Sequence, residues 1–235
     1  MSQLFHTFLY QPLFNLLVIL YTSVPGHDIG VAIVILTLLI KLVLYPLTKK
    51  TLDAQKKMQV LQPKLKEVQE KYKHDKAVQA QETMKVYQDH GVHPLGGCLP
   101  LLVQIPLLLA LFQVFRTGFD AAALSNLYSF VQNPGIINPW FLGFLNLSQK
   151  STILAILAGA FQFFHTYLIS GVKTIPSSND LGSVMQKQTL FMMPALTFII
   201  SLSLPAALPL YWVANTLFSI GEHYLPSKMN NRRSP

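Results

Sequence analysis

A single lysine interrupts a long apolar run near the N-terminus. The run covers residues 29–47 (IGVAIVILTLLIKLVLYPL), and Lys41 carries its only charge. A charged side chain near the centre of a membrane-spanning helix costs about 2.5–3.5 kcal/mol on insertion scales, so such residues usually face protein or water. We therefore predict that Lys41 lies in a polar cavity within the membrane. The alternative is snorkelling, in which the long stem carries the ammonium group to the interface beyond Leu47.

Like Lys41, the polar side chains of Thr37, Gln104 and Asn215 lie inside apolar runs. A buried hydroxyl or amide group must find a hydrogen-bond partner or water. These residues are therefore candidates for a polar lining shared with Lys41. For Gln104 and Asn215 the alternative is ordinary hydrogen bonding between neighbouring helices.

The sequence carries no recognisable pattern for catalysis or metal binding. The zinc-protease, nucleophile-elbow and phosphate-loop motifs are all missing. His90, His93 and Cys98 could in principle bind a metal ion, but their spacing fits no standard site. Cys98 is the single cysteine, so no intrachain disulfide can form. We predict that the chain is not an enzyme and uses neither a metal nor a cofactor.

The acidic residues outside the segment 49–94 are few. Each is expected near a helix end or in a loop: Asp28, Asp120, Asp180 and Glu222. A proton-coupled transporter usually needs an acidic residue inside the membrane, so this distribution argues against that class.

The elements that must position these residues are membrane helices. The chain is 51% hydrophobic and 12% charged, with a mean hydropathy of +0.39, whereas soluble domains carry about 25% charged residues. Five apolar runs reach or approach the length of a membrane span: residues 29–47, 95–115, 152–170, 189–204 and 206–225. They predict an all-α polytopic membrane protein with five transmembrane helices.

Basic residues set the predicted orientation. Ten lysines lie between the first two spans, Lys173 and Lys187 flank the loop between the third and fourth, and further basic residues lie in the tail. All three segments fall on one side if five helices alternate. Because short loops rich in Lys and Arg stay in the cytoplasm, the N-terminus is predicted outside and the C-terminus inside. Anionic lipids are the expected partner of the +8 net charge, and no nucleic-acid substrate is indicated.

The first 28 residues have no basic n-region and no cleavage site of a secretory signal. Residues 13–24 are apolar but short for a span, and a turn follows at residues 25–28. We predict an N-terminal interfacial helix on the outer leaflet. The alternative is a buried half-span.

Residues 49–94 are predicted to form a helical hairpin on the cytoplasmic side. One helix has an apolar seam, made of Met58, Leu61, Leu65, Val68 and Tyr72. The pattern breaks at residues 73–76, where Asp75 is a candidate N-cap. A second, weaker seam follows, made of Ala80, Met84, Tyr87 and Gly91. The alternative is a solvated linker with no fixed position.

Several segments resemble the YidC/Oxa family of membrane protein insertases in its short bacterial form. HPLGGCLPLLVQIPLLLALF at residues 93–112 is similar to the family signature that opens a transmembrane helix after the hairpin. LTLLIKLVLYPLTKK resembles the first core helix, with its basic groove residue, and LQPKLKEVQEKY resembles the start of the hairpin. FMMPALTFIISLSLPAALPLYWVANTL resembles the last two helices. The likeness covers roughly residues 10–225, in order and at matching spacings.

The resemblance implies a hydrophilic groove that is open to the cytoplasm and to lipid. It implies a client-binding site of Lys41, Thr37, Gln104, Tyr211, Trp212 and Asn215. A hydrophilic segment of a nascent membrane protein would enter the groove while its apolar segment passes into the bilayer. It also implies the bacterial inner membrane as location, and leaves a ribosome and a Sec-type translocon as further partners to consider.

Two departures from the family pattern matter for the site. Lys41 stands where the family usually has Arg, which keeps the charge but loses the planar fork of the guanidinium group. His93 stands where the hairpin-end motif usually begins with Asn. Two other functions remain open on the residues alone: a small channel or transporter subunit, and a chaperone that holds helices without inserting them.

The predicted organisation follows from these segments. An N-terminal interfacial helix (1–28) precedes the first transmembrane helix (29–48) and the cytoplasmic hairpin (49–94). Four transmembrane helices lie within 95–225, with an extracytoplasmic loop near 118–150, and a basic cytoplasmic tail (226–235) follows.

Overall fold

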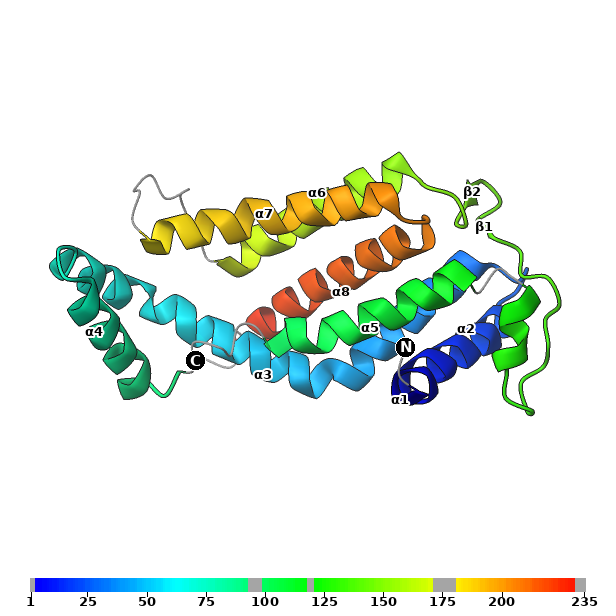
Figure 1. The fold of residues 1–235 in the computed structure, drawn as a ribbon, viewed down its shortest axis with the longest axis horizontal. Coiled ribbons are helices and arrows are strands. Elements are labelled where there is room, and N and C mark those ends of the chain that lie inside the picture. The colour runs from blue at the N-terminus through cyan, green and yellow to red at the C-terminus, as the bar shows by residue number, and fades with distance from the viewer. Residues whose placement is uncertain (1–2, 93–98, 118–120, 171–180, 231–235) are drawn as a thin grey trace.

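The chain is almost entirely helical in a computed structural model that describes residues 3–92, 99–117, 121–170 and 181–230 (Figure 1). The helical elements are α1 (Gln3–Phe5), the π-helical turn η1 (His6–Tyr10), α2 (Gln11–Ser23), α3 (Ile29–Lys71), α4 (Lys76–Asp89), α5 (Leu99–Thr117), the 3₁₀ turn η3 (Ala121–Asn126), α6 (Thr152–Ser170), α7 (Leu181–Ser203) and α8 (Ala207–Asn230). Two short strands, β1 (Trp140–Phe141) and β2 (Leu145–Asn146), pair antiparallel.

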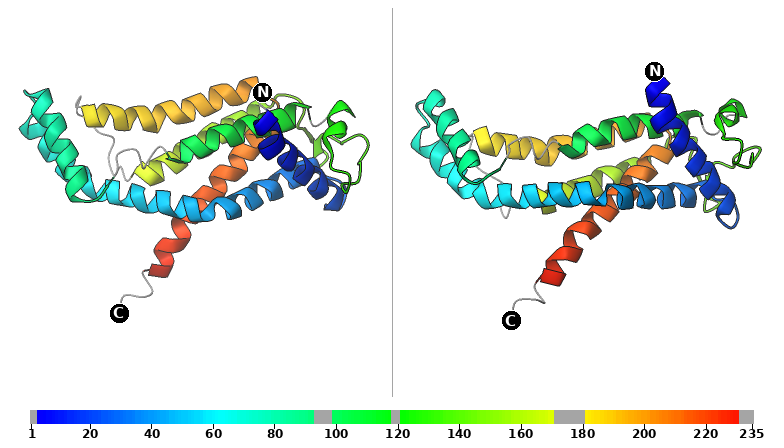
Figure 2. Two further views of the ribbon diagram at one scale, coloured as in Figure 1. Left: turned by 60° about the horizontal axis from the view of Figure 1, so that its bottom comes forward. Right: turned by 90° about the horizontal axis from the view of Figure 1, so that it is seen from below.

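Helix α8 lies in the middle of the bundle. It packs against α3 on one side and α6 on the other, and α6 and α7 run side by side (Figure 1). Figure 2 shows that α8 crosses α3 obliquely and that its C-terminal end leads away from the other helices. A residue in the middle of α8 is therefore placed to meet several neighbouring helices.

The main apolar core joins α2, the first half of α3, α5 and the start of α8. Phe14, Ile33, Leu111 and Leu208 are at most 1% exposed within it. By contrast, α6 and α7 expose large apolar side chains on their outer faces, among them Ile153, Ile156, Phe164, Phe191 and Ile199. Exposed apolar surface of this extent is typical of helices that face lipid.

The described residues contain three helical segments long and apolar enough to cross a membrane: Gln3–Ser23, Ile29–Met58 and Thr152–Ile169. Shorter apolar helices cover Gln104–Thr117 and Leu190–Ser203. The segment that we predicted to be interfacial thus has the length of a span, and it buries Phe14, Leu17 and Val18 against the core. Five spans and an interfacial N-terminus remain predictions.

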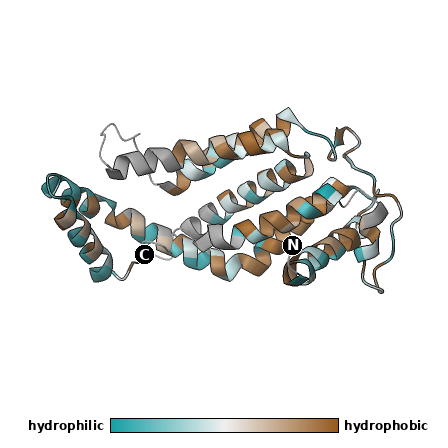
Figure 3. Cartoon of the chain, viewed as in Figure 1, coloured by the Kyte–Doolittle hydropathy of each residue, from teal (hydrophilic) through white to brown (hydrophobic). Residues whose placement is uncertain are grey.

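Helix α3 is continuous across the predicted boundary at residue 48. It begins at an N-cap, where the Asp28 carboxylate accepts a hydrogen bond from the Val31 amide at 3.0 Å, and it runs on to Lys71 with Pro46 and Pro63 inside it. Its surface changes from apolar to hydrophilic along its length (Figure 3). The change in composition near residue 48 thus involves no break in the backbone, and the membrane boundary there remains a prediction.

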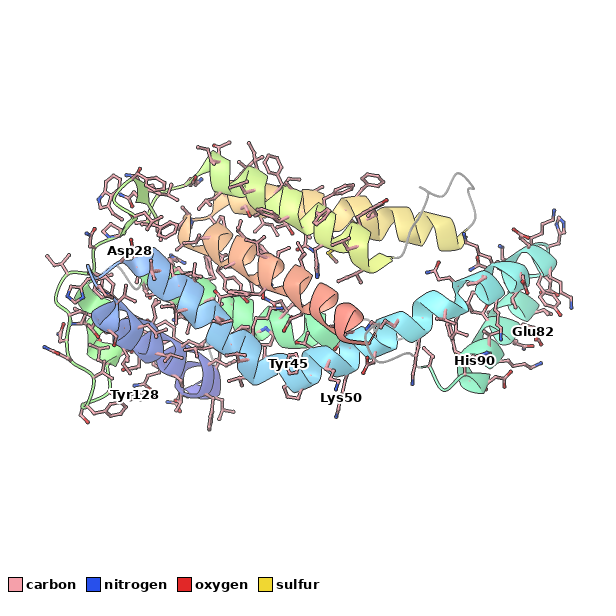
Figure 4. All side chains as sticks on the ribbon, turned by 180° about the vertical axis from the view of Figure 1, so that it is seen from behind. Asp28, Tyr45, Lys50, Glu82, His90 and Tyr128 are labelled. Atoms are coloured by element: carbon pink, nitrogen blue, oxygen red, sulfur yellow. The ribbon has the colours of Figure 1, made fainter. Side chains whose placement is uncertain are left out.

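Helix α4 folds back on the last part of α3. The Asp75 side chain accepts hydrogen bonds from the Ala77 and Val78 amides, each at 3.1 Å, as expected for an N-cap. Figure 4 shows Glu82 and His90 on this pair of helices, at the opposite end of the molecule from Asp28.

A small apolar cluster holds α3 and α4 together. Leu61 and Leu65 of the predicted first seam are buried there with Val92, and Met58, Val86 and Tyr87 pack around them. Burial raises the pKa of Tyr87. The predicted second seam is wrong at Ala80, Met84 and Gly91, which are exposed. Of its members only Tyr87 packs against the cluster, together with Val86.

At the other end of α3, the segment between α5 and α6 is tied to the N-terminal helices. The buried Asn15 amide donates to the Asn126 carbonyl at 3.0 Å and accepts from the Tyr128 amide at 2.7 Å. The Asp28 carboxylate, besides capping α3, accepts a hydrogen bond from the Leu142 amide at 2.6 Å. The contact between Asp28 and Leu142 holds the β1–β2 hairpin over the start of α3.

Candidate functional site

Lys41 contacts α8 through two polar side chains. Its ammonium group donates hydrogen bonds to Ser219 Oγ at 2.6 Å and to Glu222 Oε2 at 3.4 Å. The side chains of Lys41 and Glu222 are 14% and 15% exposed, so the ion pair is largely removed from the surface. The ammonium group is thus held by a neighbouring helix, as expected for a charge that faces protein.

Glu222 does not lie at a helix end as predicted. Helix α8 continues beyond it to Asn230, past the end of the predicted span at residue 225. Glu222 therefore lies within the helix with its carboxylate beside Lys41, and the prediction that it lies near a helix end or in a loop is wrong. The ion pair supplies the reason, because Lys41 partners a charge that would otherwise be costly to bury.

Ser219 links the ion pair to a predicted site residue. Its hydroxyl group accepts from Lys41 and donates to the Asn215 carbonyl at 3.0 Å, one turn earlier in α8. Asn215 therefore contributes its backbone to this network. The Ser219 hydroxyl is satisfied both as donor and as acceptor, which fixes its position beside the ammonium group.

One face of α8 carries the polar side chains of the site, namely Tyr211, Asn215, Ser219 and Glu222. The successive spacings of four, four and three residues bring all of them to the same side of a helix. Ser219 and Glu222 were missed by the sequence analysis. The signal was available as a continuation of the helical period from Tyr211 and Asn215.

A second polar contact joins α8 to α5. Gln104 Nε2 donates to the Tyr211 hydroxyl at 3.0 Å, and Tyr211 is 1% exposed. This is the hydrogen bond between neighbouring helices that we had considered as the alternative for Gln104. Tyr211 precedes Ser219 by two turns, about 12 Å along the helix axis. The predicted site residues therefore form two separate polar contacts.

Thr37 and Trp212 lie among apolar side chains. Thr37 is one turn before Lys41 on α3 but only 1% exposed, and its hydroxyl donates to the Ile33 carbonyl at 2.7 Å within the same helix. Trp212 is half-buried and packs against the main apolar core. Neither residue joins the hydrogen bonds around Lys41.

A further polar contact connects α8 to α6. The Thr216 hydroxyl lies 3.5 Å from Gln162 Oε1, and Gln162 Nε2 lies 3.4 Å from Thr166 Oγ1 on the next turn of α6. These residues also went unnoticed in the sequence, because single Thr and Gln residues in apolar runs give no indication of which helix they face.

The part of the chain that the structure describes contains no group of three or more His, Cys, Asp or Glu side chains that could hold a metal ion. His93 and Cys98 lie outside the described residues. His90 has other partners, since Nδ1 lies 2.9 Å from the Val86 carbonyl and Nε2 lies 2.9 Å from Lys64 Nζ.

Comparison with known proteins identifies relatives over nearly the whole chain. Residues 19–233 match the family model described as "60Kd inner membrane protein". A membrane protein insertase YidC of Fusobacterium nucleatum is 34% identical over 201 residues, which are 86% of this chain and 87% of that protein. One of Oceanobacillus iheyensis is 35% identical over 216 residues, 89% of this chain and 79% of that protein.

Other relatives are longer. A YidC of Syntrophus aciditrophicus is 37% identical over 220 residues, and the chain spans 36% of its length. A crystal structure of an active YidC insertase with the first transmembrane domain resolved superposes with a TM-score of 0.63 at 26% identity, over 92% of this chain and 46% of that one. With the family model matched along most of the sequence and relatives of similar length at 34–35% identity, this chain belongs to the YidC/Oxa family of membrane protein insertases.

Proposed function

We propose that this protein is an insertase that moves short hydrophilic segments of client membrane proteins across the bilayer and releases their apolar helices into it. The observation that carries the proposal is the polar face of α8. Within an apolar bundle, this face presents Tyr211, Ser219 and Glu222 to polar partners on α3 and α5. Membership in the family of YidC insertases supports the same function.

The proposed path of the hydrophilic segment is a groove between α3, α5 and α8. Lys41, Gln104 and the polar face of α8 would let the polar groups of a client meet protein or water instead of hydrocarbon, which lowers the cost of their passage. Trp212 and Asn215 would shape the wall of the groove, and Thr37, which is 1% exposed, would support that wall from the apolar core. A positive charge at Lys41 would attract acidic residues in the translocated segment.

The apolar segment of the client would move along exposed apolar helix faces. Ile105 and Leu109 of α5 are 45% and 52% exposed, and Ile105 directly follows Gln104. Burial of about 20 apolar residues in the bilayer supplies the driving force, at about 25 cal/mol for each Å² removed from water. No external energy source is required for this step.

The location and partners belong to the same proposal. The protein would be a multi-pass component of a bacterial inner membrane, with its N-terminus outside and its basic hairpin and C-terminus in the cytoplasm. Its partners would be nascent membrane proteins and anionic lipids. A ribosome docking at the hairpin and a Sec-type translocon are further candidates.

Reconstitution of the purified protein into liposomes tests the proposal. An insertase carries the hydrophilic tail of a client into the lumen, where added protease no longer reaches it, and the liposomes stay tight to ions. A channel passes ions without a client, and a holding chaperone keeps the client soluble but leaves its tail outside. Empty liposomes and liposomes with an unrelated multi-pass protein give the background. Tail protection no higher than this background would contradict the insertase.

A further inference from the structure

Resting on the proposed function, we infer that Glu222 competes with the acidic residues of a client for Lys41 and so determines which clients the groove accepts. The carboxylate on α8 occupies the position beside the ammonium group that a client carboxylate would need. A client would then be inserted according to how well its acidic residues replace Glu222.

The geometry around Lys41 supports the competition. Its ammonium group already has a carboxylate partner at 3.4 Å and a hydroxyl partner at 2.6 Å, and its side chain is 14% exposed. An ammonium group has three donors, two of which are used here, so a client carboxylate can bind to the third but meets the unneutralised charge of Lys41 only when Glu222 moves away. Ser219 is anchored to the Asn215 carbonyl, which leaves Glu222 as the partner that can be exchanged.

The charge balance makes the site selective. With Glu222 ionised, Lys41 and Glu222 together present no net charge to an arriving segment. A neutral hydrophilic segment gains nothing from separating the pair, whereas an acidic segment replaces one carboxylate with another. Without Glu222 the site would carry a full positive charge, and its preference for acidic segments would rise.

The exchange is compatible with the position of Glu222. Its side chain is 15% exposed, and it lies in the C-terminal half of α8, which continues to Asn230. Because the side chain is partly exposed, a change of rotamer would move the displaced carboxylate away from Lys41. The distance of 3.4 Å between Nζ and Oε2 exceeds the ~2.7–2.9 Å of a close charge-assisted hydrogen bond, so this contact is the one open to exchange.

The test compares Glu222→Gln with the parent in liposomes, using one client whose translocated tail carries either Asp or Asn at the same position. Glu222→Gln should raise the ratio of Asp-client to Asn-client insertion by about threefold or more, because the ammonium group of Lys41 then attracts the Asp tail without a competing carboxylate. Glu222→Asp, whose carboxylate is held one methylene further from Lys41, should give an intermediate ratio. An unchanged or lowered ratio for Glu222→Gln would overturn the inference. If Glu222→Gln does not accumulate, the comparison of Glu222→Asp with the parent decides.

A second comparison separates competition from simple repulsion of client acids by Glu222. In a Lys41→Ala background, Glu222→Gln should raise the ratio less than in the presence of Lys41, because no ammonium group is left to be freed. An equal rise in both backgrounds would mean that Glu222 acts by repulsion alone. The client with Asn in its tail separates this inference from the proposed function. If the parent protein does not insert that client, the proposed insertase function is contradicted, whatever Glu222 does.

Discussion

The backbone of Gly30, in the first turn of α3, lies directly against the aromatic ring of Phe141 in β1. A Cβ atom at Gly30 would overlap the Phe141 side chain, and no such overlap arises at Gly221 in α8, where nothing lies within 4 Å of the added atom. Together with the hydrogen bond from the Leu142 amide to Asp28, this contact fixes the β1–β2 hairpin on the bundle.

Gly30→Ala should therefore destabilise the protein, while Gly221→Ala should not. The added methyl group forces either Phe141 or α3 to move, and overpacking of this kind costs about 1–3 kcal/mol. Thermal unfolding in detergent measures the effect, with Gly221→Ala as the matched control. Combining Gly30→Ala with Phe141→Ala should cost less than the sum of the two single changes, because the space is then free. Strict additivity would show that the two residues do not contact each other.

The packing of α4 on α3 yields a second prediction. Leu65 is 8% exposed inside the apolar cluster, whereas Val60 on the same helix is 76% exposed. Leu65→Asp should open the pair of helices, because it removes a buried apolar side chain and places a charge there, at a cost of about 3 kcal/mol or more. Proteolysis near His74 in intact membranes should accelerate by about a hundredfold or more, which corresponds to this loss.

Val60→Asp is the control for that experiment, since it introduces the same charge on a solvent-facing position of the same helix. It should leave the proteolysis rate close to that of the parent. Equal acceleration by both substitutions would mean that Leu65 does not pack against α4.

Sequence reasoning was most successful where structure depends on neighbours along the chain. Asp75 caps α4 as predicted, because an N-cap depends on residues within one turn. Lys41 was singled out because a charge in an apolar run is informative on its own. Glu222 and Ser219 were missed because their significance depends on which face of α8 meets α3, and that is decided by packing between segments far apart in sequence.

The predicted end of the first transmembrane helix at residue 48 differs from the continuous helix α3 because composition alone does not end a helix. The composition changes near residue 48, which suggested two elements, but a helix continues wherever its backbone hydrogen bonds are kept. Pro46 and Pro63 each remove one donor without ending α3. Thr37 illustrates a different limit of the sequence. We predicted it as a lining residue because it is polar within an apolar run, but its hydroxyl group donates to the Ile33 carbonyl within its own helix.

The proposed orientation makes a third prediction. Asn133 lies between α5 and α6, and His74 lies in the turn between α3 and α4. In a Cys98→Ser background, single cysteines at these positions should react with an impermeant maleimide from opposite sides of the membrane, with His74→Cys labelled from the cytoplasm. Labelling of both positions from one side would contradict the orientation. The insertion activity of Cys98→Ser, compared with that of the parent, shows whether the background substitution leaves the protein intact.

The last prediction concerns the charge at Lys41 itself. Lys41→Arg should retain insertion of a client with Asp in its tail, because the positive charge beside Ser219 and Glu222 is kept. Lys41→Ala should reduce insertion of this client by about tenfold, equivalent to about 1.4 kcal/mol, and should affect the matched Asn client much less. Lys41→Glu should be worse than Lys41→Ala, because it sets a second carboxylate beside Glu222.

Loss of a buried partner could also lower the amount of folded protein, since an unpaired Glu222 is costly to keep inside the bundle. Insertion is therefore normalised to the protein recovered in the liposomes, and Lys41→Ala with Glu222→Gln serves as a variant with no unpaired charge.

Lys41→Leu distinguishes the groove from snorkelling. If Lys41 only carried its charge to the interface, Lys41→Leu would insert the Asp client as well as the parent does, because the apolar side chain removes a charge that costs a few kcal/mol in a span. The contact with α8 leads us to expect the opposite result, a loss for the Asp client as large as that of Lys41→Ala.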